Sequence, residues 1–180
     1  RKEAKVVETQ QMVTFVLDKE EYASAIGDLR EIIKMREVIP IPGAPAFIAG
    51  ILNVRGQIVV VVNLEKRFAL VREHPTTPLH IIIAEVEANV FGILVDEVTG
   101  VLRVPVTSIK PAPAMITSKI HADYLNGVIV LEGESSGTAP GDAKKLARLL
   151  LVLDIPRMLA EKELLQFGET IQETVKETTK

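Results

Sequence analysis

Three histidines are the first candidates for chemistry, because an imidazole can act as a general base or bind a metal ion. They are His74, His80 and His121, and none has a second His, a Cys or a carboxylate at metal-ligand spacing. His80 lies in an apolar run that predicts a strand. A structural or surface role is favoured for each histidine, so we predict no metal site.

Two pairs of carboxylates could carry out acid–base chemistry, namely Glu85 with Glu87 and Asp96 with Glu97. Such a pair needs an apolar pocket that separates the two pKa values. Glu85 and Glu87 lie on one face of a predicted strand, where a solvated strand edge is the favoured interpretation. A small-barrel hydrolase that uses Asp96 or Glu97 as its base is a distant alternative, which the absence of a pocket would exclude.

Motifs for a catalytic nucleophile or for phosphate binding give no stronger indication of an enzyme. The chain has no Cys and no Gly-x-Ser-x-Gly motif. Gly137 and Gly141 are separated by only three residues, and no Lys directly follows Gly141, so this loop does not match a phosphate-binding loop. These patterns therefore give no catalytic residue and no cofactor site to predict.

One segment stands out, because it places an arginine beside a glycine between two very apolar stretches, within residues 42–64. Gly56 allows the backbone to turn sharply. Arg55 presents a rigid fork of hydrogen-bond donors, and arginine is enriched in binding hot spots. A turn with a solvent-facing arginine is the alternative, but the segment favours a charged anchor for a protein partner.

The elements that must position these residues are predicted to be mainly strands. The 180 residues include 22 Val and 18 Ile but only 4% aromatic residues, and β-branched side chains favour extended backbone. Turn signals recur about every ten residues, which favours barrels or sandwiches. The segment 28–33 predicts a single helical turn or an irregular strand. The predicted strands are 11–17 and 22–26, which form a hairpin, 58–62, 79–86, 90–95, 101–106, 125–131 and 146–153.

A polar insertion at 132–145, rich in Gly, Ser and Pro, follows the predicted strand 125–131 and predicts a flexible loop. Asp154 is a predicted N-cap whose carboxylate accepts the amide of Arg157, with Pro156 in the first turn. We expect this helix to end near Gly168. Residues 169–180 hold only two apolar side chains, so we expect a polar, disordered tail.

Composition and charge exclude several functional classes. The net charge is −3 and no basic cluster exists, so nucleic-acid binding is not expected. No apolar run is long enough to cross a bilayer, and the absence of Cys suits a reducing compartment, so we expect a cytoplasmic protein. Because the first residue is not Met, we expect a trimmed or processed chain.

Several motifs share the order of a known family. The strongest are 45–50 (Pro-Ala-Phe-Ile-Ala-Gly), 53–58 (Asn-Val-Arg-Gly-Gln-Ile) and 61–64 (Val-Val-Asn-Leu), and 13–22, 30–32, 91–98 and 109–113 support them. With these motifs, residues 10–165 resemble the CheW-like family of chemotaxis coupling proteins. Three departures are Asn63 where the family usually has Asp, the sequence Ala-Ser-Ala at 23–25, and the long 132–145 insertion.

The resemblance implies an all-β fold, with two small five-stranded, SH3-like β-barrels packed together over a shared core and a C-terminal helix. The implied organisation is a 1–10 N-terminal extension, a CheW-like domain at 11–168 and the 169–180 tail. The implied function is a non-catalytic adaptor that couples the cytoplasmic tip of methyl-accepting chemoreceptors to the regulatory domain of a chemotaxis histidine kinase. The alternative is a CheW-like regulatory domain taken from a histidine kinase or from a receiver-containing coupling protein.

By the same resemblance, five residues are expected to contact partners: Leu29, Glu31, Arg55, Gly56 and Phe91. Glu31 and Arg55 are expected on one side of a barrel, close enough to form an ion pair. Leu29, Glu31 and the apolar residues near Phe91 are expected in the groove between the barrels, where a receptor helix would bind.

Overall fold

The computed structural model describes residues 7–67, 77–117, 120, 122–132 and 147–178. One five-stranded sheet, the first barrel, contains β1 (Thr9–Leu17), β2 (Glu20–Ala25), β8 (Glu97–Pro105), β9 (Leu125–Glu132) and β10 (Ala147–Leu153). The other, the second barrel, contains β3 (Glu31–Lys34), β4 (Ile48–Val54), β5 (Gln57–Val62), β6 (His80–Val86) and β7 (Asn89–Val95). The helical elements are η1 (Ile26–Asp28), α1 (Leu64–Arg67), η2 (Val106–Ser108), α2 (Ala114–Thr117), η3 (Ala122–Tyr124), α3 (Ile155–Leu159) and α4 (Lys162–Thr178).

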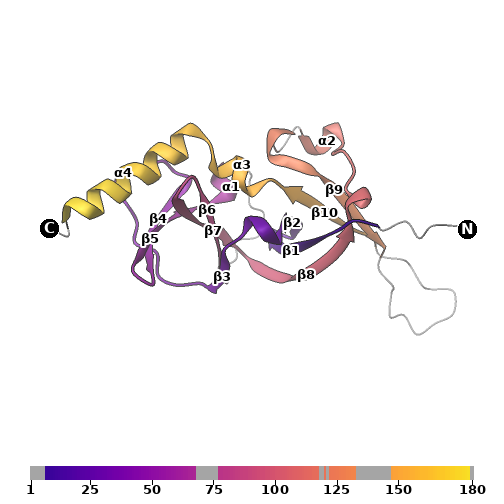
Figure 1. Cartoon of the computed structure of the whole chain (residues 1–180), viewed down its shortest axis with the longest axis horizontal. Coiled ribbons are helices and arrows are strands. Elements are labelled where there is room, and N and C mark those ends of the chain that lie inside the picture. Colours follow the sequence, from indigo (N-terminus) through magenta and orange to yellow (C-terminus); the bar gives the residue numbers. More distant parts are fainter. Residues whose placement is uncertain (1–6, 68–76, 118–119, 121, 133–146, 179–180) are drawn as a thin grey trace, which may run out of the picture.

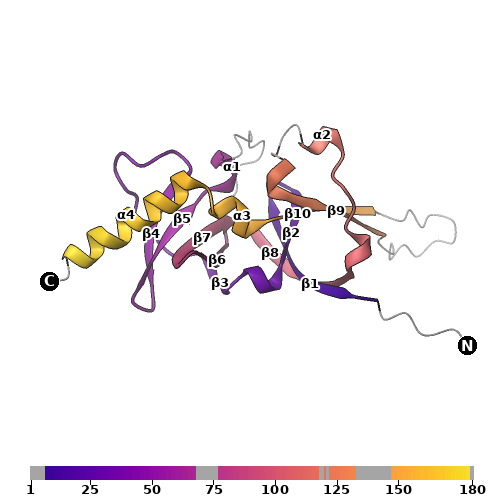
Figure 2. The ribbon, with the colours of Figure 1, turned by 45° about the horizontal axis from the view of Figure 1, so that its top comes forward.

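The chain starts in the first barrel, builds the whole second barrel and then returns to complete the first. The strand orders are β8-β1-β2-β10-β9 and β3-β6-β7-β5-β4. The two barrels lie side by side along the long axis of the molecule, and α4 runs along the second barrel (Figures 1 and 2). The predicted all-β fold with two five-stranded, SH3-like barrels and a C-terminal helix is confirmed.

The hydrophobic core has three parts, one inside each barrel and one shared between the barrels. A single strand can contribute to two of them because its successive side chains point to opposite faces. In β5, Val59 and Val61 point into the second barrel, whereas Val60 and Val62 join a core shared by both barrels. In β10, Leu150 and Val152 point into the first barrel, whereas Leu151 and Leu153 point to the shared core. Strands buried on both faces are therefore continuous apolar runs, as predicted for 58–62.

Tight hairpins connect several strands through two residues with positive φ. Such type I′ turns match the right-handed twist of the flanking strands. The β1–β2 turn has Asp18 at φ 47° and Lys19 at φ 70°, which confirms the predicted hairpin. The β6–β7 turn has Glu87 at φ 51°, so the prediction that Glu87 lies within a strand is wrong. The segment predicted as a helical turn or an irregular strand contains η1 and then β3.

The C-terminal helices confirm one prediction and correct another. The Asp154 carboxylate accepts the backbone N–H of Arg157 at 3.1 Å at the start of α3, as expected. Helix α4, however, passes through Gly168 and continues to Thr178, so the predicted disordered tail is wrong over most of its length. The helix is held there because Ile171 packs against the shared core and the Gln172 side-chain amide donates to the Ile58 carbonyl at 3.0 Å.

The predicted flexible insertion at 132–145 lies, apart from Glu132, outside the described residues. The strands on either side of it are paired, since Ala147 is opposite Glu132 in the β9–β10 ladder.

Two glycines allow an edge strand of each barrel to lie close to the backbone of a preceding segment, at Ile39 and at Lys110. Gly127 in β9 has φ +145°, and a Cβ there would lie 2.3 Å from the Lys110 carbonyl oxygen. Gly50 in β4 has φ +148° and a similar approach of 2.1 Å to the Ile39 carbonyl oxygen. Each glycine therefore allows a backbone contact that a larger residue would prevent.

We expect Gly127→Ala to lower the free energy of unfolding by at least about 2 kcal/mol, because it adds both backbone strain and a clash with main chain. Gly27→Ala is the matched control, since nothing lies within 4 Å of a Cβ there, and should change stability by no more than about 0.5 kcal/mol. Urea denaturation measures both. Equal stability of the two variants would contradict the argument.

Candidate functional site

The β4–β5 hairpin presents Arg55 and Gly56 at one end of the second barrel. Both have positive φ, at 50° and 83°, so they form another two-residue turn. The Asn53 side-chain oxygen accepts the backbone N–H of Gly56 at 2.8 Å, which fixes the turn. The motif residues Asn53, Arg55 and Gly56 thus act together to project the arginine from a rigid hairpin.

Arg55 forms the predicted ion pair with Glu31. Its Nη1 donates to Glu31 Oε2 at 2.6 Å, and the two side chains are 75% and 24% exposed. Glu31 is held in β3, opposite Ile83 of β6. An exposed pair of this kind contributes only about 0–1 kcal/mol to stability. Its main effect is to orient the guanidinium while leaving most of it open to solvent.

A second arginine, which the sequence analysis did not select, extends this charged cluster. Arg30 Nη1 donates to the Gln57 side-chain oxygen at 3.0 Å and lies 3.5 Å from Glu85 Oε2. Glu85 was predicted to be a solvated strand edge and is half-exposed here. The side chains of Arg30, Gln57, Glu31 and Arg55 surround a cleft of about 120 Å³. Its apolar floor is formed by Val54, Val59, Ile83 and Val90.

The other predicted contact residues do not join this cluster. Leu29 is half-buried and packs against the shared core, next to the junction of the barrels. Phe91 is 0% exposed and belongs to the same core, with α4 packed above it. The prediction that Phe91 contacts a partner is therefore wrong while α4 stays in place, because no part of its side chain reaches the surface.

Arg67 of α1 links the two barrels and was not found from the sequence. Its guanidinium lies over the rings of Phe47 and Tyr124, 5.5 Å and 5.9 Å from their centres, and it forms an ion pair with Glu161. Phe47 precedes β4 in the second barrel and Tyr124 precedes β9 in the first. Cation–π contacts of this kind contribute about 0.5–2 kcal/mol each.

Two of the catalytic candidates, His80 and Asp96, have structural roles, whereas His74 and His121 lie outside the described residues. His80 Nδ1 accepts the backbone N–H of Val98 at 3.3 Å, and Asp96 Oδ2 accepts the backbone N–H of Asp18 at 2.8 Å. Within the described ranges, no group of three His, Cys, Asp or Glu could hold a metal ion. No helix in the described part of the chain is long and apolar enough to cross a membrane.

The Asp28 carboxyl, beside Asp154 at the start of α3, has a shifted pKa that bears on stability. Burial, and secondarily the charge of Asp154, raises its pKa above the usual value. Because the folded-state pKa exceeds the unfolded one, the folded protein holds this proton more tightly. Stability from Asp28 is therefore present at low pH and is lost as the pH rises through the raised pKa.

We expect Asp28→Asn to unfold at a higher urea concentration than the parent at pH 7, because asparagine cannot ionise. The difference should vanish near pH 3, where the carboxyl is protonated in both states. Glu163→Gln, which removes an exposed carboxylate from α4, is the control. A difference between Asp28→Asn and the parent that does not change with pH would contradict the assigned cause.

Comparison with known proteins agrees with this geometry. A family model described as CheW-like domain matches residues 11–163. Chemotaxis protein CheW of Treponema pallidum (strain Nichols) is 36% identical over 159 residues, which are 86% of this chain and 84% of the relative. Chemotaxis protein CheW of Klebsiella aerogenes is 31% identical over 155 residues, with the same coverage. The crystal structure of scaffolding protein TtCheW from Thermoanaerobacter tengcongensis matches with a TM-score of 0.68 and 25% identity, over 91% of this chain and 96% of that one. The chain therefore belongs to the CheW-like domain family.

Proposed function

We propose that this protein is a non-catalytic, cytoplasmic adaptor that couples chemoreceptors to a chemotaxis histidine kinase. The observation that carries the proposal is the family match over residues 11–163, which includes both barrels. The relatives named above are chemotaxis proteins, and the solved one is a scaffolding protein. An adaptor needs separate surfaces for two partners and no reactive centre.

The charged cluster around Arg55 suits the contact with the regulatory domain of the kinase. Its arginine is exposed but already oriented by Glu31, so binding costs little side-chain entropy. The apolar floor of the cleft can exclude water from the contact. Arginines in this setting are frequent binding hot spots.

The junction between the barrels suits the helical tip of a receptor. Leu29 is half-buried there, and Ile32 of β3 is 38% exposed. A helix that lies in such a groove is anchored by an apolar stripe. Leu29 and Arg55 would then serve different partners, which makes the two contacts separable by mutation.

We expect Arg55→Glu to fold normally but to lose about 2–4 kcal/mol of partner binding, as hot-spot arginines do. Glu31→Arg in the same chain should restore part of the coupling, because the swapped charges rebuild the pair. A double-mutant cycle of receptor-dependent kinase activity in a reconstituted array measures this. Arg103→Glu, on the other barrel, is the control. Strict additivity of the two single effects would contradict a working Glu31–Arg55 pair.

We expect Leu29→Asp to weaken receptor binding while kinase binding is kept, because a charge in the groove opposes an apolar stripe. Separate pull-downs with receptor fragment and kinase measure the two affinities. Ile39→Asp, at an exposed apolar site elsewhere on the second barrel, should affect neither. Equal loss of both partners, with an unchanged melting temperature, would show that Leu29 does not mark a receptor-specific groove.

A further inference from the structure

The two barrels follow one structural plan. In each, the third and fourth strands of the sheet are parallel and the other neighbours are antiparallel, with β2 beside β10 in the first barrel and β7 beside β5 in the second. Along the chain, the two barrels differ only in which of the five strands comes first. The corresponding strands, first barrel first, are β8 and β3, β9 and β4, β10 and β5, β1 and β6, and β2 and β7. Surfaces of one barrel can therefore be matched to surfaces of the other.

The residues that directly follow β5 and β10 show which positions of the two barrels correspond. Asn63 and Asp154 each donate their backbone N–H at 2.8 Å, to the carbonyls of Phe47 and Tyr124 respectively. The side-chain oxygen of each accepts the N–H three residues later, at 3.1 Å. The parallel registers then agree, since Val60 pairs with Phe91 and Leu151 with Tyr22. The matched residues, second barrel first, are Ile58 and Leu149, Val60 and Leu151, Asn89 and Glu20, and Phe91 and Tyr22.

On the second barrel, helix α4 covers these residues. A Cβ on Gly168 would lie 3.1 Å from the Asn89 side-chain oxygen and 3.4 Å from the ring of Phe91. The side-chain amide of Gln172 donates a hydrogen bond to the carbonyl of Ile58. Figure 2 shows the helix lying along this barrel. This face of the second barrel is thus a packing surface for an amphipathic helix.

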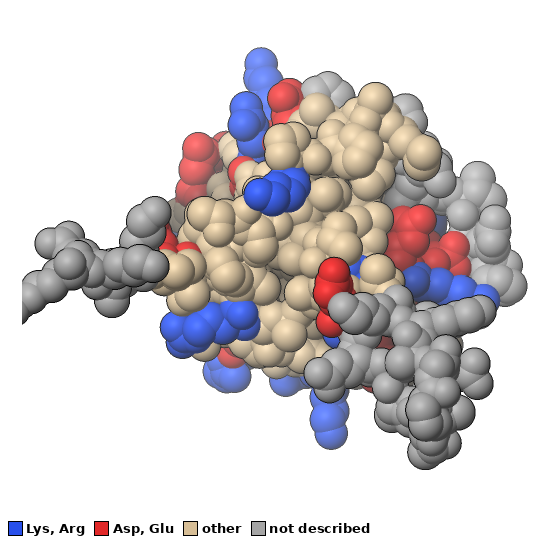
Figure 3. Space-filling view, turned by 90° about the vertical axis from the view of Figure 1, so that its right-hand side faces the viewer, with Lys and Arg blue, Asp and Glu red and all other residues tan. Residues whose placement is uncertain are grey.

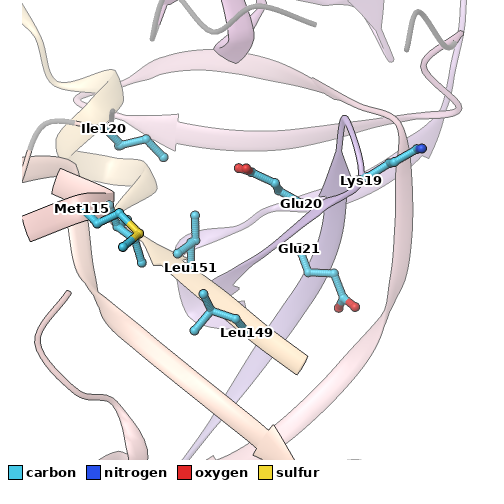
Figure 4. Close-up of a pocket in the computed structure, with 8 residues that line it drawn as sticks. Lys19, Glu20, Glu21, Met115, Ile120, Leu149 and Leu151 are labelled. Atoms are coloured by element: carbon cyan, nitrogen blue, oxygen red, sulfur yellow. The ribbon is translucent and has the colours of Figure 1, made fainter. Parts of the chain in front are cut away.

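On the first barrel, the matched face is a pocket of about 420 Å³. Leu149 and Leu151 form one side, and Met115 and Ile120 face them from α2 and the residues after it (Figure 4). Met115 is 79% exposed and Leu149 is 47% exposed. The end of the molecule formed by this barrel also presents a broad surface with few charged side chains (Figure 3).

The pocket differs from its counterpart in charge. Glu20, which replaces Asn89, points into the pocket and accepts the Tyr22 hydroxyl at 3.1 Å (Figure 4). Glu21 points away and is paired with Arg148 through contacts of 3.0 Å and 2.5 Å. One carboxylate therefore faces the apolar lining, where a cation would be favoured.

We propose that this pocket, the first-barrel groove, binds an amphipathic helix of a partner protein that places apolar side chains between α2 and β10 and a lysine or arginine against Glu20. The model for this interaction is the packing of α4 on the corresponding face of the second barrel. The groove lies on the first barrel, apart from the Arg55 cluster of the second, so the proposal adds a third docking surface to the two proposed above.

The probe is a synthetic peptide with the sequence of residues 162–178 and the change Gly168→Lys, which puts a cation at the helix position that faces Asn89 in the packing of α4 on the second barrel. We expect it to bind the full chain with a dissociation constant of about 1 mM or lower and to shift the methyl NMR signals of Leu149, Leu151 and Ile120. Leu149→Glu or Met115→Glu in the protein should weaken binding at least tenfold. Val101→Glu is the matched control, because Val101 is 54% exposed at the other edge of the sheet.

Two further variants test the chemistry of the groove. Glu20→Gln should weaken the lysine peptide several-fold and leave the unmodified 162–178 peptide unchanged. A Thr170→Pro peptide, which cannot form the helix, should not bind.

The proposal is overturned if no signals shift, if only Ile58 and Val60 shift because the peptide displaces α4, or if the proline peptide binds equally well. Self-association that Leu149→Glu abolishes, without peptide binding, would instead assign the groove to a second copy of this chain. None of these results depends on receptor or kinase binding, so they are independent of the proposed function.

Discussion

The hydrophobic core between the barrels is the constraint on which the rest of the structure depends. Among the described residues, the shared cluster contains more buried residues than the two internal clusters combined. Strands such as β5 and β10 are apolar on both faces because one face fills a barrel and the other fills this junction. Separating the barrels would expose both halves of the largest cluster, so we infer that they fold as one unit.

A rigid junction also determines how far apart the partner surfaces lie. The Arg55 hairpin stands on the second barrel, Leu29 lies beside the junction, and the pocket next to Glu20 belongs to the first barrel. Arg67 reinforces this arrangement because it contacts an aromatic ring from each barrel and an acid before α4. A coupling protein of the proposed kind transmits information through fixed geometry rather than through chemistry.

The departures from the family pattern have different consequences. Asn63 stands where the family usually has Asp, yet its amide oxygen caps the next turn in the same way as the carboxylate of Asp154 does. This substitution therefore leaves the local structure intact, because the cap needs an acceptor and not a charge. The equivalent positions Asn89 and Glu20 differ in charge and in exposure. Asn89 is buried beneath α4, whereas Glu20 lines an open pocket, where its charge affects which ligands can bind.

The sequence by itself determined most of the strands, the first hairpin, the Asp154 cap and the Glu31–Arg55 pairing within the implied fold, because apolar periodicity, turn residues and family motifs report local structure. Only the tertiary structure decided that Phe91 is buried, that residues 169–178 are helical and that Arg30 and Arg67 belong to charged clusters. Each of these depends on a surface supplied by residues far away in the chain. The few apolar side chains of 169–178 cannot stabilise a helix in isolation, but they do so once β5 and β7 provide the face against which α4 packs.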